Sequence, residues 1–294
     1  MIRRLLYVVM VLALAGSVSG CGLVRSSIAS LKSTADFVPM AADARALAEP
    51  GSEDVAVIAA KELSGAIATV EREQYRPFAG PVRVYVTRDE ESFAAFTGVA
   101  KEVRGAVILK LFLSGGLRKE PDRIKRILAH ELSHLHLGQR LGIYGYNASL
   151  PSWFQEGLAV IVSSGGGAEK MSEAGAAKAI LQGKSLIPED TGSFFFKKFA
   201  ASYGLKPPMF YRQSGMFVSY LRRHDEAGFR TLLLAVEEGR GLRESFKNAY
   251  GMGIEEAWQQ FIKQLKQGGP RRNMARNIET RNRSGKIAQK GRKR

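Results

Sequence analysis

The chain has 294 residues, of which 45% are hydrophobic and 24% charged, and its formal net charge is +16. This is an ordinary globular composition, and the length can bury a substantial core in one large domain or two small ones. A single cysteine, Cys21, excludes an internal disulfide and a cysteine-rich metal site. No apolar run reaches about twenty residues, so a mature transmembrane helix is not expected.

The first twenty residues have the outline of a secretory signal. Two arginines begin the segment, residues 5–15 form a short apolar stretch, and residues 18–21 (VSGC) close it. These last residues resemble the lipobox of bacterial lipoproteins, which implies cleavage before Cys21 and a stable lipid anchor on that residue. An ordinary signal peptide or an uncleaved anchor is the alternative. By resemblance to enterobacterial sorting, Gly22 favours the outer membrane, facing the periplasm, over the inner membrane.

The N-terminal half reads as a tether followed by alternating helices and strands. Residues 21–50 are rich in Ala and Ser, and we expect a tether that leads into the first helix. Residues 53–76 carry apolar side chains at close to a 3.6-residue spacing, which predicts a helix. Residues 82–87 alternate apolar and polar, which predicts a strand. Residues 88–97 predict a short helix, closed by Gly98.

The middle of the chain predicts strands followed by one central helix. Residues 103–114 are strongly apolar and predict one or two strands. Residues 120–122 (EPD) suit the first turn of a helix, which Gly138 or Gly142 can end. Strands that lead directly into a helix indicate an α+β fold, with a small mixed sheet packed on that helix.

The C-terminal part is mainly helical in pattern. Helices are predicted from residue 152 to about 163 and over residues 172–182, and helical periodicity resumes from Phe210 onward. Residues 187–208 have no clear pattern. Within them, the aromatic cluster of residues 194–199 favours a place in the core, with a substrate pocket or a partner contact as the alternative.

Most of the positive charge lies in the last 27 residues. Residues 268–294 carry ten Lys or Arg against Glu279 alone, a net of +9, whereas residues 21–267 keep about +5 by subtraction. The tail has almost no hydrophobic residues, so we expect disorder. Contact with anionic lipid of the envelope is one expectation and a solvated end without a partner is an equal one; nucleic acid is not expected as a partner of an exported chain.

The central helix contains HELSH, residues 130–134. Residues four apart lie on one face of a helix, so His130 and His134 can reach a single cation while Glu131 points beside it. This is the arrangement of a zinc site in which the acid transfers protons and is not a ligand. The pattern also occurs by chance in unrelated helices, so the prediction depends on a third ligand.

Glu156 is the best candidate for that ligand. Of the remaining histidines, His136 points to another face of the helix and His224 lies at a charged helix end. Glu156 lies on the next predicted helix, within PSWFQEGLA, where an unpaired charge among apolar residues would be costly. Gly157 would let two helices approach closely enough to share a metal. The alternative is a solvent-facing Glu on an amphipathic helix.

HELSH followed by PSWFQEGLA resembles the gluzincin metallopeptidases, specifically the peptidase MA-like group with its W-x-x-E-G-L-A second helix. Residues 211–221 and FKNAYG at 246–251 are similar to later parts of that group, so the resemblance spans about residues 82–266. It implies a zincin-like metallopeptidase domain, which we place over residues 51–267. It also implies hydrolysis of a peptide or protein substrate, here in the cell envelope.

The resemblance further implies one Zn²⁺ per chain, held by His130, His134 and Glu156, with Glu131 as the general base that activates the zinc-bound water. The alternative function is a non-catalytic zinc-binding lipoprotein with a scaffolding role. The presence of Glu131 argues against that alternative, because a structural site needs ligands but no base.

Three further features follow from the same resemblance. Tyr211 is the candidate donor to the oxyanion, with packing beside Phe210 as its alternative role. The substrate is expected to lie extended along an edge strand within residues 103–114, unless that strand is fully paired. The thermolysin pattern has an Asp four residues after the ligand Glu, where this chain has Val160, so the partner that orients a ligand histidine is not identified.

Overall fold

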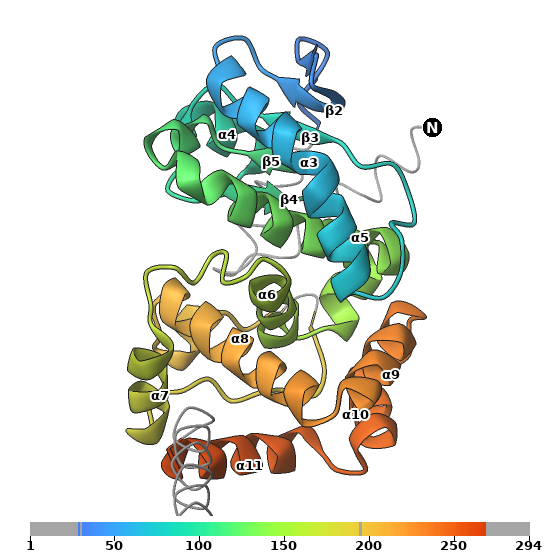
Figure 1. The fold of residues 1–294 in the computed structure, drawn as a ribbon, viewed down its shortest axis with the longest axis vertical. Coiled ribbons are helices and arrows are strands. Elements are labelled where there is room, and N and C mark those ends of the chain that lie inside the picture. The colour runs from blue at the N-terminus through green and yellow to red at the C-terminus, as the bar shows by residue number, and fades with distance from the viewer. Residues whose placement is uncertain (1–28, 30, 194–195, 269–294) are drawn as a thin grey trace, which may run out of the picture.

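The structure is a computed structural model that describes residues 29, 31–193 and 196–268 (Figure 1). Cys21 with the expected signal, and residues 269–294 of the basic tail, lie outside the described residues. One end of the molecule is a mixed sheet of five strands in the order β1-β2-β3-β5-β4. The strands are β1 (Val38–Met40), β2 (Asp43–Ala48), β3 (Val84–Val86), β4 (Gly105–Val107) and β5 (Leu111–Leu113).

The expected tether is wrong over residues 38–48, which form β1 and β2. These strands pair antiparallel with each other, and β2 pairs parallel with β3. Alanines are uncommon in strands, but Ala46 and Ala48 are buried in the same core as Ala56 and Ala59 of helix α3 (Glu53–Glu73). Small side chains on both elements let the helix lie close to the sheet, and this packing outweighs the weak strand propensity of alanine.

The sheet has a helical layer on each face. Val84 and Val86 of β3 point toward α3 and helix α5 (Ile124–Ser149), and they share one core with the α5 stripe that includes Leu128. Tyr85 points to the opposite face, where it packs in a second, aromatic core with Phe93 of helix α4 (Glu90–Thr97). The alternation of residues 84–86 therefore explains how one short strand supports both layers.

Helix α5 is broken inside its span. Gly138 continues the helix, whereas Gly142 has φ 66° and ψ 169°, a conformation that is readily accessible only to glycine. Of the two predicted end points, Gly142 is the real break. The chain resumes a helical course after Gly142 and runs on to Ser149. The break redirects the later residues of α5, with consequences for the site described below.

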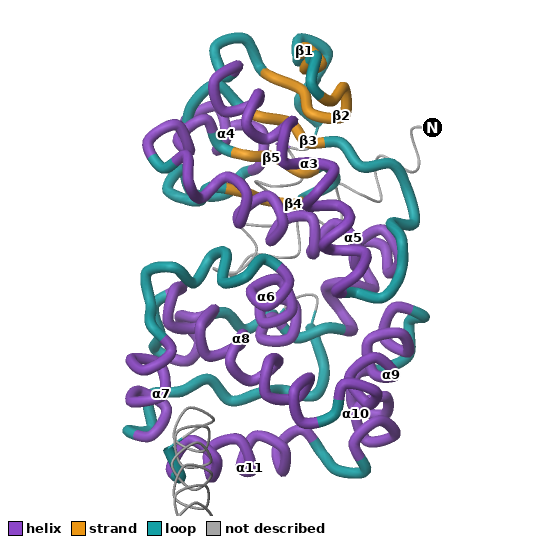
Figure 2. Tube along the Cα trace, viewed as in Figure 1, coloured by secondary structure: helices purple, strands orange, loops and turns teal. Residues whose placement is uncertain are grey.

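The rest of the described chain is helical, as predicted, and forms the other end of the molecule (Figure 2). These helices are α6 (Ser152–Val162), α7 (Glu173–Leu181), α8 (Pro207–His224), α9 (Glu226–Glu237), α10 (Leu242–Tyr250) and α11 (Ile254–Lys266), and the 3-10 turn Ala200–Tyr203 lies between α7 and α8. Two more 3-10 turns, Gly115–Lys119 and Pro121–Arg123, precede α5. The α+β fold class is thus confirmed. Among the described helices, none has the length and apolarity needed to cross a bilayer.

The aromatic cluster of residues 194–199 does not belong to the core where it can be described. The side chain of Phe196 is 82% exposed and that of Phe199 is 48% exposed. The core expectation is therefore wrong for these two residues, while residues 194–195 lie outside the described chain. Between the two exposed phenylalanines, Lys197 turns the opposite way, toward α6.

Candidate metal centre

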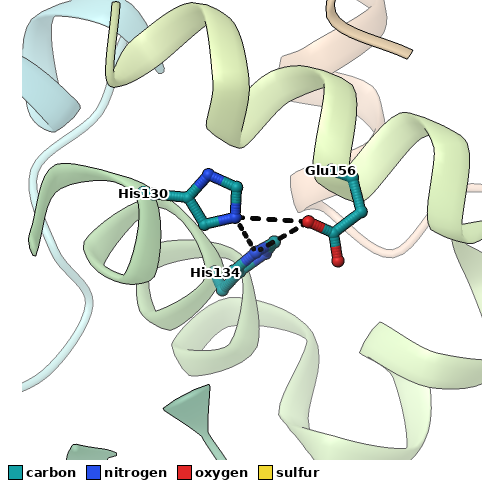
Figure 3. Close-up of side chains that lie close together, drawn as sticks. All are labelled: His130, His134 and Glu156. Atoms are coloured by element: carbon teal, nitrogen blue, oxygen red, sulfur yellow. Dashed lines mark hydrogen bonds and ion pairs between the residues drawn. The ribbon is translucent and has the colours of Figure 1, made fainter. Parts of the chain in front are cut away.

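Three side chains converge between α5 and α6 (Figure 3). Nε2 of His130 lies 3.1 Å from Nε2 of His134 and 3.2 Å from Oε2 of Glu156. Nε2 of His134 lies 3.5 Å from the same carboxylate oxygen. The candidate ligand atoms all lie within 4.8 Å of one another. The structure thus brings together the three residues singled out in the sequence, and the alternative of a solvent-facing Glu156 does not hold.

The position of Glu156 depends on how tightly α6 packs against α8. A Cβ atom on Gly157 would lie 2.5 Å from Cγ2 of Val218 and 2.6 Å from the carbonyl oxygen of Ser214. Gly215 of α8 faces Val160 of α6 in the same close way. Gly157 therefore does permit a close helix contact, but the partner is α8 and not the histidine-bearing α5 that we expected.

The hydrogen bonds of the two imidazoles test whether this cluster suits a cation. Nδ1 of His130 lies 3.0 Å from the carbonyl oxygen of Gly166, which can only accept, so Nδ1 carries the proton. Nδ1 of His134 lies 2.8 Å from the hydroxyl of Tyr146. A hydroxyl both donates and accepts, so Nδ1 of His134 can carry its proton as well. In that tautomer the two Nε2 lone pairs face each other and a carboxylate oxygen. Such a set is repulsive by itself and fits a divalent metal ion.

The charges in the cluster are strongly coupled. Burial raises the pKa of Glu156, but the adjacent imidazoles of His134 and His130 outweigh burial and hold this pKa well below its usual range. Burial lowers the pKa of His130, yet its hydrogen bond with Glu156 and the charge of that residue bring the net shift upward. A proton and a cation can each occupy the position between the imidazoles and the carboxylate, so metal binding competes with protonation there.

Glu131 lies beside the cluster and against the sheet. Its side chain is buried, and burial raises the pKa of its carboxyl group. A Cβ atom on Gly105 would lie 2.5 Å from Cγ and 2.8 Å from Oε1 of Glu131, so only glycine at this point of β4 leaves room for the carboxylate. Strand β5 is paired on both sides, whereas β4 is the edge strand of the described sheet. Of residues 103–114, β4 is thus the part that has an open edge.

Tyr211, near the start of α8, lies beside His130. Its ring centroid is 6.1 Å from that of His130 and also 6.1 Å from that of Phe210. The charge of Glu156 and burial raise the pKa of Tyr211 well above its usual range, so its hydroxyl keeps its proton and can donate. Both roles predicted for Tyr211, as the donor to the oxyanion and as a packing partner of Phe210, are compatible with this position.

A family model described as the peptidase MA superfamily matches residues 78–264. The chain belongs to the peptidase MA superfamily. A search of the curated proteins and a search of the solved structures each gave no match. The matched residues of this peptidase MA chain include the metal cluster and Glu131, whereas β1, β2 and α3 precede the match. Family and cluster together support a metallopeptidase, with His130, His134 and Glu156 as the group that could hold its metal.

In the thermolysin pattern, an Asp four residues after the ligand Glu orients a histidine. In this peptidase MA chain, other groups orient the two histidines. Val160 packs on Gly215 of α8 and contacts neither imidazole by a hydrogen bond. The orienting groups are the carbonyl of Gly166 and the hydroxyl of Tyr146. Residues 165–167 are a run of three glycines that follows α6. Their loop also passes over His130, because a Cβ atom on Gly167 would lie 3.1 Å from Cε1 of that ring.

Two histidines of this peptidase MA chain lie away from the cluster, as predicted. Nε2 of His136 accepts from or donates to no cluster residue and instead lies 2.9 Å from the carbonyl oxygen of Arg76. His136 is buried on a different face of α5. His224 is exposed at the end of α8, where it stacks on Tyr220. Neither residue belongs to the group that could hold a metal in the described chain.

Proposed function

We propose that the chain is a zinc-dependent peptidase of the gluzincin type, with His130, His134 and Glu156 holding one zinc ion and Glu131 acting as the general base. The observation that carries this proposal is the convergence of two outward-oriented imidazoles and one carboxylate beside a buried acid that contacts the edge strand. A purely structural metal site has no use for that fourth group.

A zinc ion held by these residues would polarise a carbonyl oxygen and make water a stronger acid. The residues of the chain do the rest. The outward hydrogen bonds of His130 and His134 fix both rings with Nε2 toward the ion. Glu131 accepts a proton from the attacking water as the new C–O bond forms. It then gives that proton to the amide nitrogen as the C–N bond breaks. Burial raises the pKa of this carboxyl group, which is the direction that makes the carboxylate a stronger base.

The open edge of β4 supports a peptide as the substrate. An extended chain can add to this edge by main-chain hydrogen bonds, and its scissile carbonyl would then lie near Glu131, which contacts Gly105. Tyr211 supplies a protonated hydroxyl beside His130 as the candidate donor to the oxyanion.

We further propose that the peptidase acts in the bacterial cell envelope, anchored by lipid on Cys21, with the outer membrane favoured. The support is the signal-like segment before Cys21 and the position of the only cysteine in the chain. Contact of the basic tail with anionic lipid belongs to the same proposal, and it predicts salt-sensitive binding to anionic vesicles that truncation at Gly268 removes.

The decisive experiment is Glu131→Gln with zinc content and peptide cleavage measured on the same preparation. We expect about one zinc per chain in both proteins and a fall in cleavage of about 10²- to 10⁴-fold in the variant. Glu156→Gln is the matched control, because it should lose zinc and cleavage together. Unchanged cleavage by Glu131→Gln would overturn the mechanism. A parent chain that holds zinc but cleaves no member of a broad peptide library would favour the non-catalytic scaffold.

A further inference from the structure

In the segment before α8, two aromatic rings are exposed and a lysine between them is turned inward, which is the reverse of the burial that folded chains usually show. Phe196 and Phe199 are exposed, by 82% and 48% of their surfaces, while Lys197 between them is turned inward. Folded chains normally bury the phenylalanine and leave the lysine in water, because a buried ammonium loses its hydration. An inward lysine at this point therefore calls for an explanation beyond packing.

The polar contacts of Lys197 bring it beside the metal centre. Its Nζ donates to Oε1 of Gln155 at 2.7 Å and to Oδ1 of Asn147 at 3.0 Å. It also lies 5.2 Å from the ring centroid of Tyr146. Gln155 directly precedes the ligand Glu156, and the hydroxyl of Tyr146 contacts the ligand His134. The ammonium group thus contacts Gln155 and Tyr146. Gln155 is the sequence neighbour of one proposed metal ligand, and Tyr146 forms a hydrogen bond with another.

No carboxylate of the described chain lies within 4.0 Å of this ammonium group, whereas the adjacent Lys198 pairs with Glu189 at 2.5 Å. Both hydrogen-bond acceptors of Lys197 are neutral amides, and an ammonium group has three N–H donors. Burial lowers the pKa of Lys197 to about 8, so the group is still mostly charged at neutral pH. It is therefore a cation with a donor to spare and no ion-pair partner in the described chain.

With the proposed zinc ion bound, no anion among the described residues would remain to balance the positive charge of Lys197. The two charges of zinc would be balanced by Glu156 and Glu131, so the positive charge of Lys197 would remain in excess beside the site. A buried positive charge is stabilised by an anion that reaches it with a hydrogen bond. A peptide substrate has one kind of group that fits, which is a carboxylate.

We propose that Lys197 is a specificity-determining residue that binds a carboxylate of the substrate, so that this site prefers peptides with an acidic side chain or a free C-terminus near the scissile bond. This inference rests on the proposed peptidase function and names its substrate class. The two sources of the carboxylate have the same chemistry, but they would make the chain a different kind of peptidase. A terminal carboxylate makes the enzyme an exopeptidase that acts near the C-terminus, and a side-chain carboxylate makes it an endopeptidase.

The test uses peptide pairs that differ only in one carboxylate. One arm compares Glu with Gln at each position of peptides blocked at both ends. The other compares a free C-terminus with its amide. Binding is measured by fluorescence anisotropy in zinc-loaded Glu131→Gln, which does not require cleavage, and kcat/KM is measured in the parent chain. We expect the parent to prefer the carboxylate member of at least one pair by about 10- to 100-fold, the usual range for a hydrogen bond to a charged group.

Lys197→Met keeps the length of the side chain and removes the charge. We expect it to reduce the carboxylate preference to about 1, whereas Lys197→Arg should retain a preference. Lys198→Met is the matched control: it removes the neighbouring lysine, which is already paired with Glu189, and should leave the preference unchanged. Zinc content and melting temperature are recorded for each variant, so that a folding defect is recognised.

Two outcomes overturn the inference. The first is a parent chain with no preference in either arm, a result that does not depend on the folding of any variant. The second is a Lys197→Met variant that weakens the acid and amide members of each pair equally, which would make Lys197 a clamp for its own segment. Absence of cleavage in the parent would contradict the proposed function instead, and the binding arm in Glu131→Gln would still test Lys197.

Discussion

The hydroxyl of Tyr146 lies 2.8 Å from Nδ1 of His134, although the two residues are 12 positions apart in the same helical segment. In an unbroken helix with a rise of 1.5 Å per residue they would be separated by about 18 Å. The break at Gly142 turns the chain back and makes the contact possible. The orientation of a candidate metal ligand therefore depends on a backbone conformation eight residues further along the chain.

Tyr146→Phe should weaken zinc binding while leaving the fold intact. The substitution removes the oxygen that faces His134 and keeps the ring, so the imidazole loses the group that fixes its orientation. Loss of such a partner typically costs 10- to 100-fold in metal affinity. The measurement is a zinc titration against a competing chelator. Tyr144→Phe is the control, because Tyr144 lies in the same segment but is 71% exposed. Equal zinc affinity in Tyr146→Phe and the parent would show that His134 needs no such partner.

Gly105→Ala should separate catalysis from metal binding. The added Cβ would lie 2.5 Å from Cγ of Glu131, so either the carboxylate or strand β4 must move. A displacement of about 1 Å in a catalytic group can lower the rate by about 100-fold. The candidate metal ligands are not among the nearest neighbours of this Cβ atom, so we expect zinc content near that of the parent with a fall in kcat/KM of this order. Loss of zinc together with activity would mean that the alanine disturbs α5 as a whole.

The sequence carried enough information for most helices and for the group that could hold a metal. Local spacing determines the helices and the pair of histidines. The i, i+4 pair of His130 and His134 requires only one regular turn of helix. Tyr146 and Lys197 could not be found in this way. Their contacts depend on the break at Gly142 and on the path of the segment before α8, and no periodicity in the sequence reports either. Strand β2 was missed for a related reason, since its alanines are explained only by the helix that covers them.

Glu237 should make stability fall as the pH rises from about 4.5 to about 7. Burial raises the pKa of its carboxyl group to about 7, although Arg140 and Arg76 act in the opposite direction. A carboxyl group with a raised pKa holds its proton more tightly in the folded state than in the unfolded state. Its protonated form therefore favours folding at low pH, and this advantage is lost as the pH rises through 7.

Glu237→Gln removes this titration. The free energy of unfolding of the parent, measured with urea, should fall relative to that of the variant by about 1–3 kcal/mol between pH 5 and pH 8. His136 lies 3.5 Å from Glu237 and burial lowers its own pKa, so the two titrations are coupled and the difference between the profiles belongs to the pair. Parallel pH profiles for the two proteins would mean that Arg76 and Arg140 keep Glu237 ionised throughout.

Gly157→Ala should reduce stability and zinc affinity together, because Glu156 is its neighbour on α6. The added Cβ would meet Cγ2 of Val218 at 2.5 Å and the carbonyl oxygen of Ser214 at 2.6 Å. Forcing extra atoms into a packed contact usually costs about 1–3 kcal/mol. The backbone oxygen cannot move without the whole of α8, so α6 must shift and carry Glu156 away from the histidines. Urea unfolding and zinc titration measure the two effects.

The contact between Gly215 of α8 and Val160 of α6 supplies a control for Gly157→Ala. A Cβ on Gly215 would meet only side-chain atoms among its nearest neighbours, all of them from Val160 and the closest at 2.4 Å. Shortening that side chain in Gly215→Ala/Val160→Ala should therefore restore much of the lost stability. In Gly157→Ala/Val218→Ala the contact with the carbonyl oxygen of Ser214 persists, so the second substitution should restore little. Equal rescue in both pairs would mean that α6 and α8 can separate slightly without moving Glu156, and the coupling of packing to zinc binding would then be absent.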